Sequence, residues 1–272
     1  MGRQDVNTER LLYLVPGLGM ILVAAVAVIY WRRVSRVEWR WFWAGAGLWT
    51  IAVALKILCA ILTNERVIGF VKEHLPFPLQ VVVGGLFVGI QSSVFEMGFT
   101  LLAVLIWRSF GQTGRRAIAV GVGAGAFEAF LLGFASTASV VAFLAGVPGT
   151  EKIGEGLASA AASMPLFWLA APIERVIAIL CHASSRALIL LGVAKQRSLL
   201  VLYGFLLFTF LDGVAGAAYV AGWVGSISVW WIELAVLPFG LISVPILRWC
   251  YTRWDEPEAS PQQAEPTTDL LA

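Results

Sequence analysis

The stretch PIERVIAILCHASSRALILLGV, residues 172–193, is apolar over most of its length and yet carries ionisable side chains. Its length fits a membrane-spanning helix, since about 20 residues cross a hydrocarbon core roughly 30 Å thick. Glu174, Arg175, His182 and Arg186 then fall inside the membrane, where a single arginine costs roughly 2.5 to 3.5 kcal/mol. Such residues persist only where they face the protein interior and pair, or serve a site. The stretch therefore predicts a membrane helix that contributes to a buried polar cluster.

The whole chain has the composition of a membrane protein. Of its 272 residues, 59% are hydrophobic and 13% are charged, and the mean hydropathy is +0.83. A soluble core cannot use so much apolar surface, which excludes soluble nucleic-acid binders and secreted disulfide scaffolds. Seven apolar runs predict an all-α, polytopic integral membrane protein with about seven transmembrane helices in one bundle. We expect these helices near residues 11–31, 41–63, 79–106, 117–145, 165–194, 199–222 and 228–248.

The distribution of Lys and Arg between alternate loops predicts the orientation. One side receives eleven: Arg32, Arg33, Arg36, Arg40, Arg108, Arg115, Arg116, Lys195, Arg197, Arg248 and Arg253. The other side receives five: Arg3, Arg10, Arg66, Lys72 and Lys152. By the positive-inside rule the N-terminus lies outside and the C-terminus in the cytoplasm. The basic loops attract anionic lipid headgroups rather than nucleic acid, so the bilayer is the first expected partner.

Three regions follow from this topology. Residues 1–10 form an extracytoplasmic segment and residues 11–250 form the transmembrane domain. Residues 255–272, rich in Pro, Gln, Ser and acids, form a disordered cytoplasmic tail. The first helix is expected to stay in the mature protein, because its apolar stretch is longer than that of a signal peptide.

Small residues in the fourth expected helix predict close helix packing. Gly121, Gly125 and Ala129 recur at every fourth position and share one helical face, which lets another helix approach closely. The three cysteines, Cys59, Cys181 and Cys250, lie in or beside apolar stretches, so we expect small core residues and not a disulfide or zinc framework.

Nine ionisable residues fall within the expected helices: Lys56, Glu96, Glu128, Glu174, Arg175, His182, Arg186, Asp212 and Glu233. Four of the acids lie at similar depth in four different helices and are expected to converge. One interpretation is structural, with hydrogen-bonded carboxylates and cationic counter-ions locking the helices together. The other is functional, with the same carboxylates serving a site. For Lys56 and Glu233 the structural interpretation is favoured, and Glu233 lies about one turn from a helix end, where water is within reach.

Helical geometry places several of these groups along one groove of the 172–193 helix. At about 100° per residue, Arg175 and His182 are about 20° apart, and Glu174 and His182 about 80° apart. Ser185 and Arg186 follow His182 by one turn and extend the polar stripe. A lone histidine on an apolar helix is more often a hydrogen-bonded core residue than a metal ligand.

Four short motifs resemble the bacterial YhfC family. They are FEMGFT around Glu96, GVGAGAFEAFLLG around Glu128, ERVIAILCHASS around Glu174, Arg175, His182 and Ser185, and FTFLDG around Asp212. That family is grouped with intramembrane metalloproteases related to the CAAX-processing and bacteriocin-processing proteases. The resemblance covers roughly residues 90 to 215 and implies a zinc-dependent peptidase.

The departures from the family pattern fall on the metal chemistry. The pattern has EExxxR, HGxxE, ERxxxxxxHxxxS and HxxxD motifs. Met97 stands in the first motif where the family has its second acid, no Arg follows at the spacing of that motif, and Ala124 and Phe208 replace histidines in the second and fourth. Glu174, Arg175 and His182 match the third motif, and Ser185 matches it approximately. One of three histidines remains.

Three functions stay open. The first is a catalytically degenerate relative that acts as a membrane subunit, scaffold or regulator of a partner protein, with no cofactor. The second is an active intramembrane peptidase that cleaves membrane-embedded peptides, with His182, Glu128 and Asp212 as zinc ligands and Glu96, Glu128 or Glu174 as catalytic carboxylates. The third is a proton-coupled transporter that uses the acids as a relay. Substrate, partner and oligomeric state do not follow from the sequence.

Overall fold

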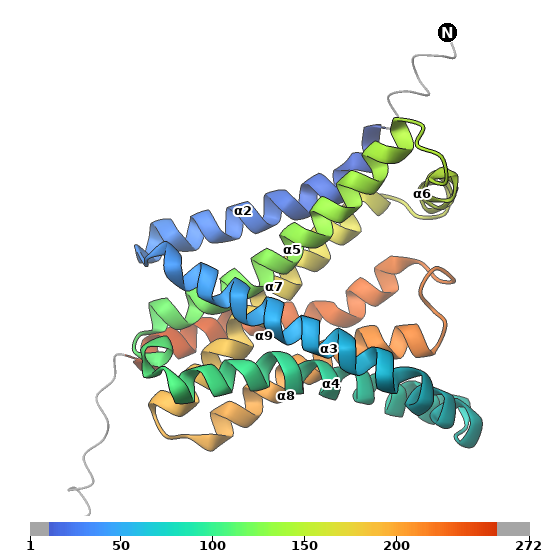
Figure 1. Ribbon diagram of the computed structural model, residues 1–272. Coiled ribbons are helices and arrows are strands. Elements are labelled where there is room, and N and C mark those ends of the chain that lie inside the picture. Colours follow the sequence, from blue (N-terminus) through green and yellow to red (C-terminus); the bar gives the residue numbers. More distant parts are fainter. Residues whose placement is uncertain (1–10, 255–272) are drawn as a thin grey trace, which may run out of the picture.

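A computed structural model describes residues 11–254, and every regular element in this range is a helix (Figure 1). The expected segments 1–10 and 255–272 lie outside the described residues. The elements are η1 (Leu12–Leu14), α2 (Val15–Ser35), α3 (Trp39–His74), α4 (Phe77–Ile106), η2 (Arg108–Gly111), α5 (Gly114–Leu144), α6 (Glu151–Ser163), α7 (Phe167–Ala194), α8 (Ser198–Val220) and α9 (Val229–Trp254). Seven of these helices are long and apolar enough to span a membrane, which confirms the predicted fold class.

Two helices are longer than predicted. α3 was expected to end at residue 63 and instead runs to His74, so His74 belongs to the helix and not to a loop. Asn64, Glu65 and Arg66 do not break it, and the helix stops only before Pro76, as residues preceding proline disfavour the helical conformation. With 36 residues, α3 is about 54 Å long and exceeds the hydrocarbon thickness. α9 likewise continues past residue 248 to Trp254.

The short helix α6 was not predicted. Its sequence, EKIGEGLASAAAS, is too polar and too short to span a membrane, and it was therefore expected to be part of a loop. The helix lies against α5 and α7, with Gly154 packed on the ring of Phe143.

Helix α7 is the centre of the bundle. It contacts α2, α4, α5, α8 and α9, while α4 pairs closely with α8 and α2 with α5 (Figure 1). The predicted close approach through small residues is confirmed. A Cβ atom at Gly121 would lie 2.5 Å from Cα of Ala183, and one at Gly125 would lie 2.9 Å from Cα of Ile179. Because α5 and α7 touch at the backbone, Glu128 on α5 comes within reach of the polar face of α7.

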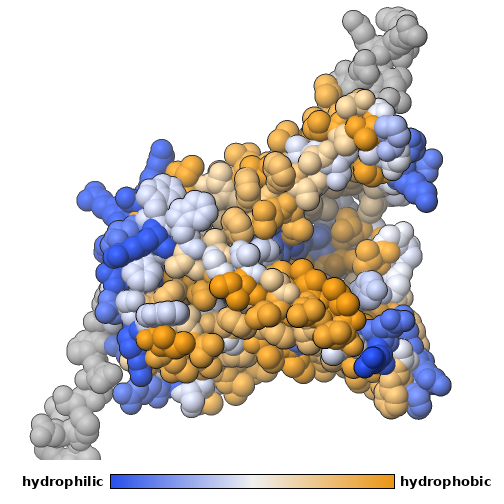
Figure 2. Space-filling model, viewed as in Figure 1, coloured by the Kyte–Doolittle hydropathy of each residue, from blue (hydrophilic) through white to orange (hydrophobic). Residues whose placement is uncertain are grey.

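The two ends of the bundle differ in charge. One end, called here the N-terminal end, holds the start of α2, the α3–α4 and α8–α9 connections and α6. The C-terminal end holds the α2–α3, α4–α5 and α7–α8 connections and the end of α9, with most of the arginines (Figure 1). Hydrophobic residues dominate the surface between the ends, and hydrophilic residues gather at both ends (Figure 2). This pattern is that of a protein surrounded by lipid.

Apolar side chains fill the bundle between its polar middle and the C-terminal end. Met97, Ile189 and Phe208 form a buried cluster beside the polar residues. A larger cluster of α3, α5, α7 and α9 residues continues towards the C-terminal end. Beyond Arg186 in this direction, the described helices carry Asp, Glu, Lys, Arg or His only in their terminal turns, except for the exposed Arg248 of α9.

Candidate functional site

One group of polar contacts is centred on Glu128 of α5 and is called here the Glu128 cluster. Arg175 Nη1 donates to Glu128 Oε1 at 2.6 Å, and the same guanidinium donates to Glu174 through Nε at 2.7 Å and through Nη2. The indole Nε1 of Trp49 donates to Glu128 Oε2 at 3.1 Å. Glu128, Glu174, Arg175 and Trp49 thus tie α3, α5 and α7 together.

A second group is centred on Glu96 of α4 and is called the Glu96 cluster. Lys56 Nζ donates to Glu96 Oε1 at 2.6 Å and to Ser92 Oγ at 2.9 Å. Ser92 in turn donates to a carboxylate oxygen of Asp212. Arg186 Nη2 donates to Glu96 Oε2 at 3.4 Å. The Glu96 cluster, made of Lys56, Ser92, Glu96, Arg186 and Asp212, links α3, α4, α7 and α8.

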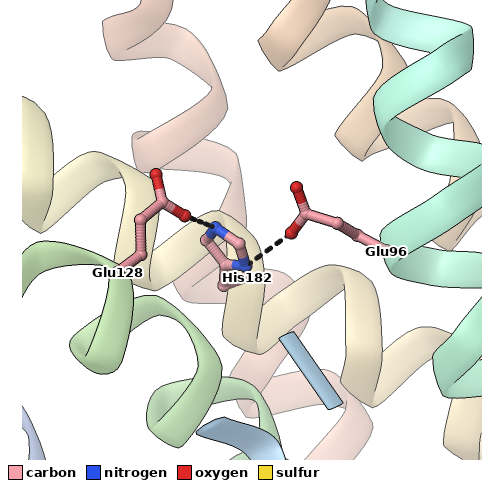
Figure 3. Close-up of side chains that lie close together, drawn as sticks. All are labelled: Glu96, Glu128 and His182. Atoms are coloured by element: carbon pink, nitrogen blue, oxygen red, sulfur yellow. Dashed lines mark ion pairs between the residues drawn. The ribbon is translucent and has the colours of Figure 1, made fainter. Parts of the chain in front are cut away.

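His182 connects the two clusters. Its Nε2 lies 2.9 Å from Glu128 Oε2, and its Nδ1 lies 3.8 Å from Glu96 Oε2, on the opposite edge of the ring (Figure 3). Arg186 Nη1 approaches Nδ1 at 2.6 Å. An arginine can only donate, so Nδ1 accepts this hydrogen bond and the ring proton sits on Nε2, facing Glu128. His182 therefore bridges a carboxylate and a guanidinium.

The predicted site residues all lie in or beside this network, except Ser185. Glu96, Glu128, Glu174, Arg175, His182 and Asp212 form a continuous chain of contacts through Ser92 and Arg186. Ser185 is fully buried, and its Oγ has no hydrogen-bond partner among the described residues. Lys56, Arg175 and Arg186 act as counter-ions, as the structural interpretation expected.

Two participants were not predicted. Ser92 precedes Glu96 by four residues on α4, and this spacing is the signal that could have indicated it. Trp49 lies in an apolar run and gives no such signal, because tryptophan is common in membrane helices and the sequence does not show which acceptor its indole N–H meets. Glu233 is only 7% exposed and belongs to neither cluster.

Glu96, Glu128 and His182 are the one group in residues 11–254 whose potential ligand atoms all lie within 4.8 Å of one another. Asp212, which the resemblance proposed as a ligand, is not part of that group. Zinc needs ligand atoms at about 2 Å around one point, with a position open for water. Here the two carboxylates approach different nitrogens of one imidazole (Figure 3).

Cations already contact all three of these candidate metal ligands. Arg186 occupies Nδ1 of His182, Lys56 binds Glu96 and Arg175 binds Glu128. Each candidate ligand thus already has a positively charged partner. As arranged, these residues do not fit a zinc site.

Apolar side chains occupy the two positions, Ala124 and Phe208, where the family that the sequence resembles has histidines. The ring of Phe208 meets the ring of His182 edge-on at a centroid distance of 4.9 Å, and the guanidinium of Arg186 lies 5.9 Å from the Phe208 centroid. Ala124, on α5, is fully buried. Phe208 therefore fills space next to His182 with a ring that cannot bind metal.

Comparison with known proteins gives one finding. Neither the curated proteins nor the solved structures include a match to this chain. The family model described as YhfC intramembrane metalloprotease matches residues 19–236, which include every residue of the two clusters and His182. The chain therefore belongs to the YhfC family.

Proposed function

We propose that this protein is a YhfC-family member without peptidase activity, which acts as a membrane subunit, scaffold or regulator of a partner protein. One observation carries the proposal: the fully buried guanidinium of Arg186 lies between His182 Nδ1 and Glu96 Oε2. A guanidinium balances carboxylate charge, as a metal does, but has no open coordination position that could activate water. Arg186 thus supports the helical frame and not hydrolysis.

The active peptidase is the second candidate, because Glu96, Glu128 and His182 do gather within 4.8 Å. No comparable observation favours a transporter. A proton relay has to reach both sides of the membrane. Beyond Arg186, the buried residues next to the network are the apolar cluster of Met97, Ile189 and Phe208, and no buried acid or histidine continues a relay there within the described residues.

Elemental analysis of protein purified without chelators tests the proposal. We expect well under one zinc per chain and no cleavage of model transmembrane peptides, since a single imidazole with paired carboxylates binds zinc weakly. His74→Ala is the matched control, because His74 is the only other histidine and lies at the end of α3. About one zinc per chain, lost in His182→Ala and kept in His74→Ala, would establish the peptidase instead.

Restoring ligands gives an independent test. Phe208→His places a second imidazole beside His182, and Arg186→Gln in the same chain removes the guanidinium from Nδ1. We expect this double variant to bind more zinc than the parent protein. If the parent protein binds zinc, and the folded double variant binds no more zinc than the parent, the role assigned to Arg186 is contradicted.

We further propose that the N-terminal end faces the outside and the C-terminal end the cytoplasm of a bacterial cell. The excess of Lys and Arg at the C-terminal end supports this orientation. Single cysteines introduced at Asp5 and Ser260, in a variant lacking the three native cysteines, test it. A membrane-impermeant thiol reagent should label the first and not the second in intact cells, and labelling of both from one side would reject the topology.

A further inference from the structure

Glu233 is a buried acid that neither cluster uses. It lies one turn into α9 and is only 7% exposed, and its Oε2 has no hydrogen-bond partner among residues 11–254. A carboxylate buried without a partner is costly, and native proteins rarely contain one without a reason such as a ligand or a functional role.

The register between α7 and α9 places Glu233 level with Glu174. The two helices run in the same direction from the N-terminal end, and Ser184 Oγ donates to Ser243 Oγ at 2.9 Å. Towards the N-terminal end, Ile177 packs against Val236 and faces Gly240. One further turn brings Glu174 opposite the start of α9, and the charge of Glu233 interacts with those of Glu174 and Arg175.

Contacts at the start of α9 hold this arrangement in place. The indole Nε1 of Trp230 donates to the carbonyl oxygen of Pro165 at 2.8 Å, and the backbone N–H of Val229 points at the sulfur of Met164 at 3.4 Å. The first turn of α9 is therefore fixed to the segment that precedes α7, which keeps the backbone of Glu233 level with Glu174.

The charges at this end of the network are not balanced. Within the described residues, Glu128 and Glu174 both bind the guanidinium of Arg175, and Glu233, which lies near that guanidinium, forms no ion pair of its own. Glu128, Glu174, Glu233 and Arg175, called here the corner, thus carry a formal excess of two negative charges. In the Glu96 cluster, Glu96 and Asp212 are matched by Lys56 and Arg186.

The corner is accessible from the N-terminal end. The side chain of Glu174 is 35% exposed and that of Glu128 is 20% exposed. The space-filling view shows a hollow between the helices, with hydrophilic residues inside it, in the half of the molecule nearer the N-terminal end (Figure 2). Glu174 and Glu233 are not part of the one group in residues 11–254 that could hold a metal ion. Two separated carboxylates suit a larger cation that forms several hydrogen bonds.

We propose that Glu174 and Glu233 bind the ammonium or guanidinium group of a ligand that enters from the N-terminal end, foremost the basic side chain of a membrane-embedded peptide. The site goes beyond the proposed function and does not depend on whether His182 binds metal. A basic group there donates to Glu233 Oε2 and to Glu174, and balances the excess negative charge. The same chemistry would also accept a small free amine.

The full chain in lipid nanodiscs, with two probes, tests the site. The first probe is a labelled Leu/Ala transmembrane peptide with one Lys about one turn inside its end, compared by fluorescence anisotropy with the same peptide carrying Gln. The second is butylammonium chloride, read as a shift in melting temperature. We expect the Lys peptide to bind about tenfold more tightly than the Gln peptide, the difference that one charge-assisted hydrogen bond contributes.

Glu233→Gln is the decisive variant, since it removes the charge with little change in size. We expect it to melt no lower than the parent and to lose the preference for Lys. Glu155→Gln, on the exposed face of α6 at the same end, removes one acid elsewhere and should keep that preference. If only butylammonium stabilises the parent, and not Glu233→Gln, the cation site stands with a free amine as its ligand. Equal binding of both peptides with no response to butylammonium, or a Lys preference that survives in Glu233→Gln, would overturn it.

Discussion

The Glu96 cluster and the Glu128 cluster use the same kinds of residue in different surroundings. Glu96 and Arg186 are almost completely buried, and the acids of their cluster are matched by cations. Glu128 and Glu174 are partly exposed, and together with Glu233 they outnumber their single arginine within the described residues. The comparison separates two roles. The balanced, buried cluster holds helices together, and the unbalanced, accessible one is suited to binding a cation.

Removing the buried arginine should have the largest effect. Arg186→Met leaves His182 Nδ1 without its donor and takes one of two cations from Glu96. Breaking a buried ion pair from one side costs about 3–5 kcal/mol, and we expect a value near the lower end because Lys56 remains. Denaturant unfolding in detergent micelles measures it. Arg108→Met, on an exposed arginine at the C-terminal end, is the control and should change stability by less than about 0.5 kcal/mol. Equal stability of the two variants would remove the structural role of the Glu96 cluster.

Glu128 should separate charge from hydrogen bonding. Glu128→Leu leaves Trp49 Nε1, His182 Nε2 and one Arg175 nitrogen without an acceptor, and we expect a loss of about 1–3 kcal/mol. Glu128→Gln keeps a carbonyl acceptor and should be mild. The same unfolding measurement compares the two. A Gln variant as unstable as the Leu variant would mean that the charge itself, and not the hydrogen-bonding capacity, stabilises the Glu128 cluster.

The smallest effect is expected at the accessible end. Glu174→Gln weakens one partner of Arg175, which keeps Glu128, and partly exposed ion pairs contribute no more than about 1 kcal/mol. We expect little change in the unfolding midpoint. A loss as large as that of Arg186→Met would show that the two clusters do not differ in the way their exposure indicates.

Most of the fold could be predicted from the sequence, because the cost of placing polar residues in lipid acts on each segment separately. Helix ends were predicted less well. Hydropathy treats Asn64–Arg66 as a break, whereas a helix needs no apolar residues to continue and stops only at Leu75 before Pro76. Helix α6 was missed for the same reason, since it does not cross the membrane.

The meeting of the acids also followed from the sequence, whereas their pairing did not. Glu96, Glu128 and Asp212 lie at similar positions along their helices, and this predicts that they share one level of the bundle. The pairing of Lys56 with Glu96 depends on α3 lying beside α4, which no local pattern encodes. The contact of Arg186 with His182 follows from their spacing of four residues on α7. The structure was needed to show that the same guanidinium also contacts Glu96.

The apolar packing beyond Arg186 has an electrical consequence. If water reaches the partly exposed Glu174 from the N-terminal end, the voltage across the membrane falls mainly across the layer built around Met97, Ile189 and Phe208. A charge that crosses a drop of 100 mV gains or loses about 2.3 kcal/mol. In that case the carboxylates of the Glu128 cluster sit close to the potential of the solution at the N-terminal end.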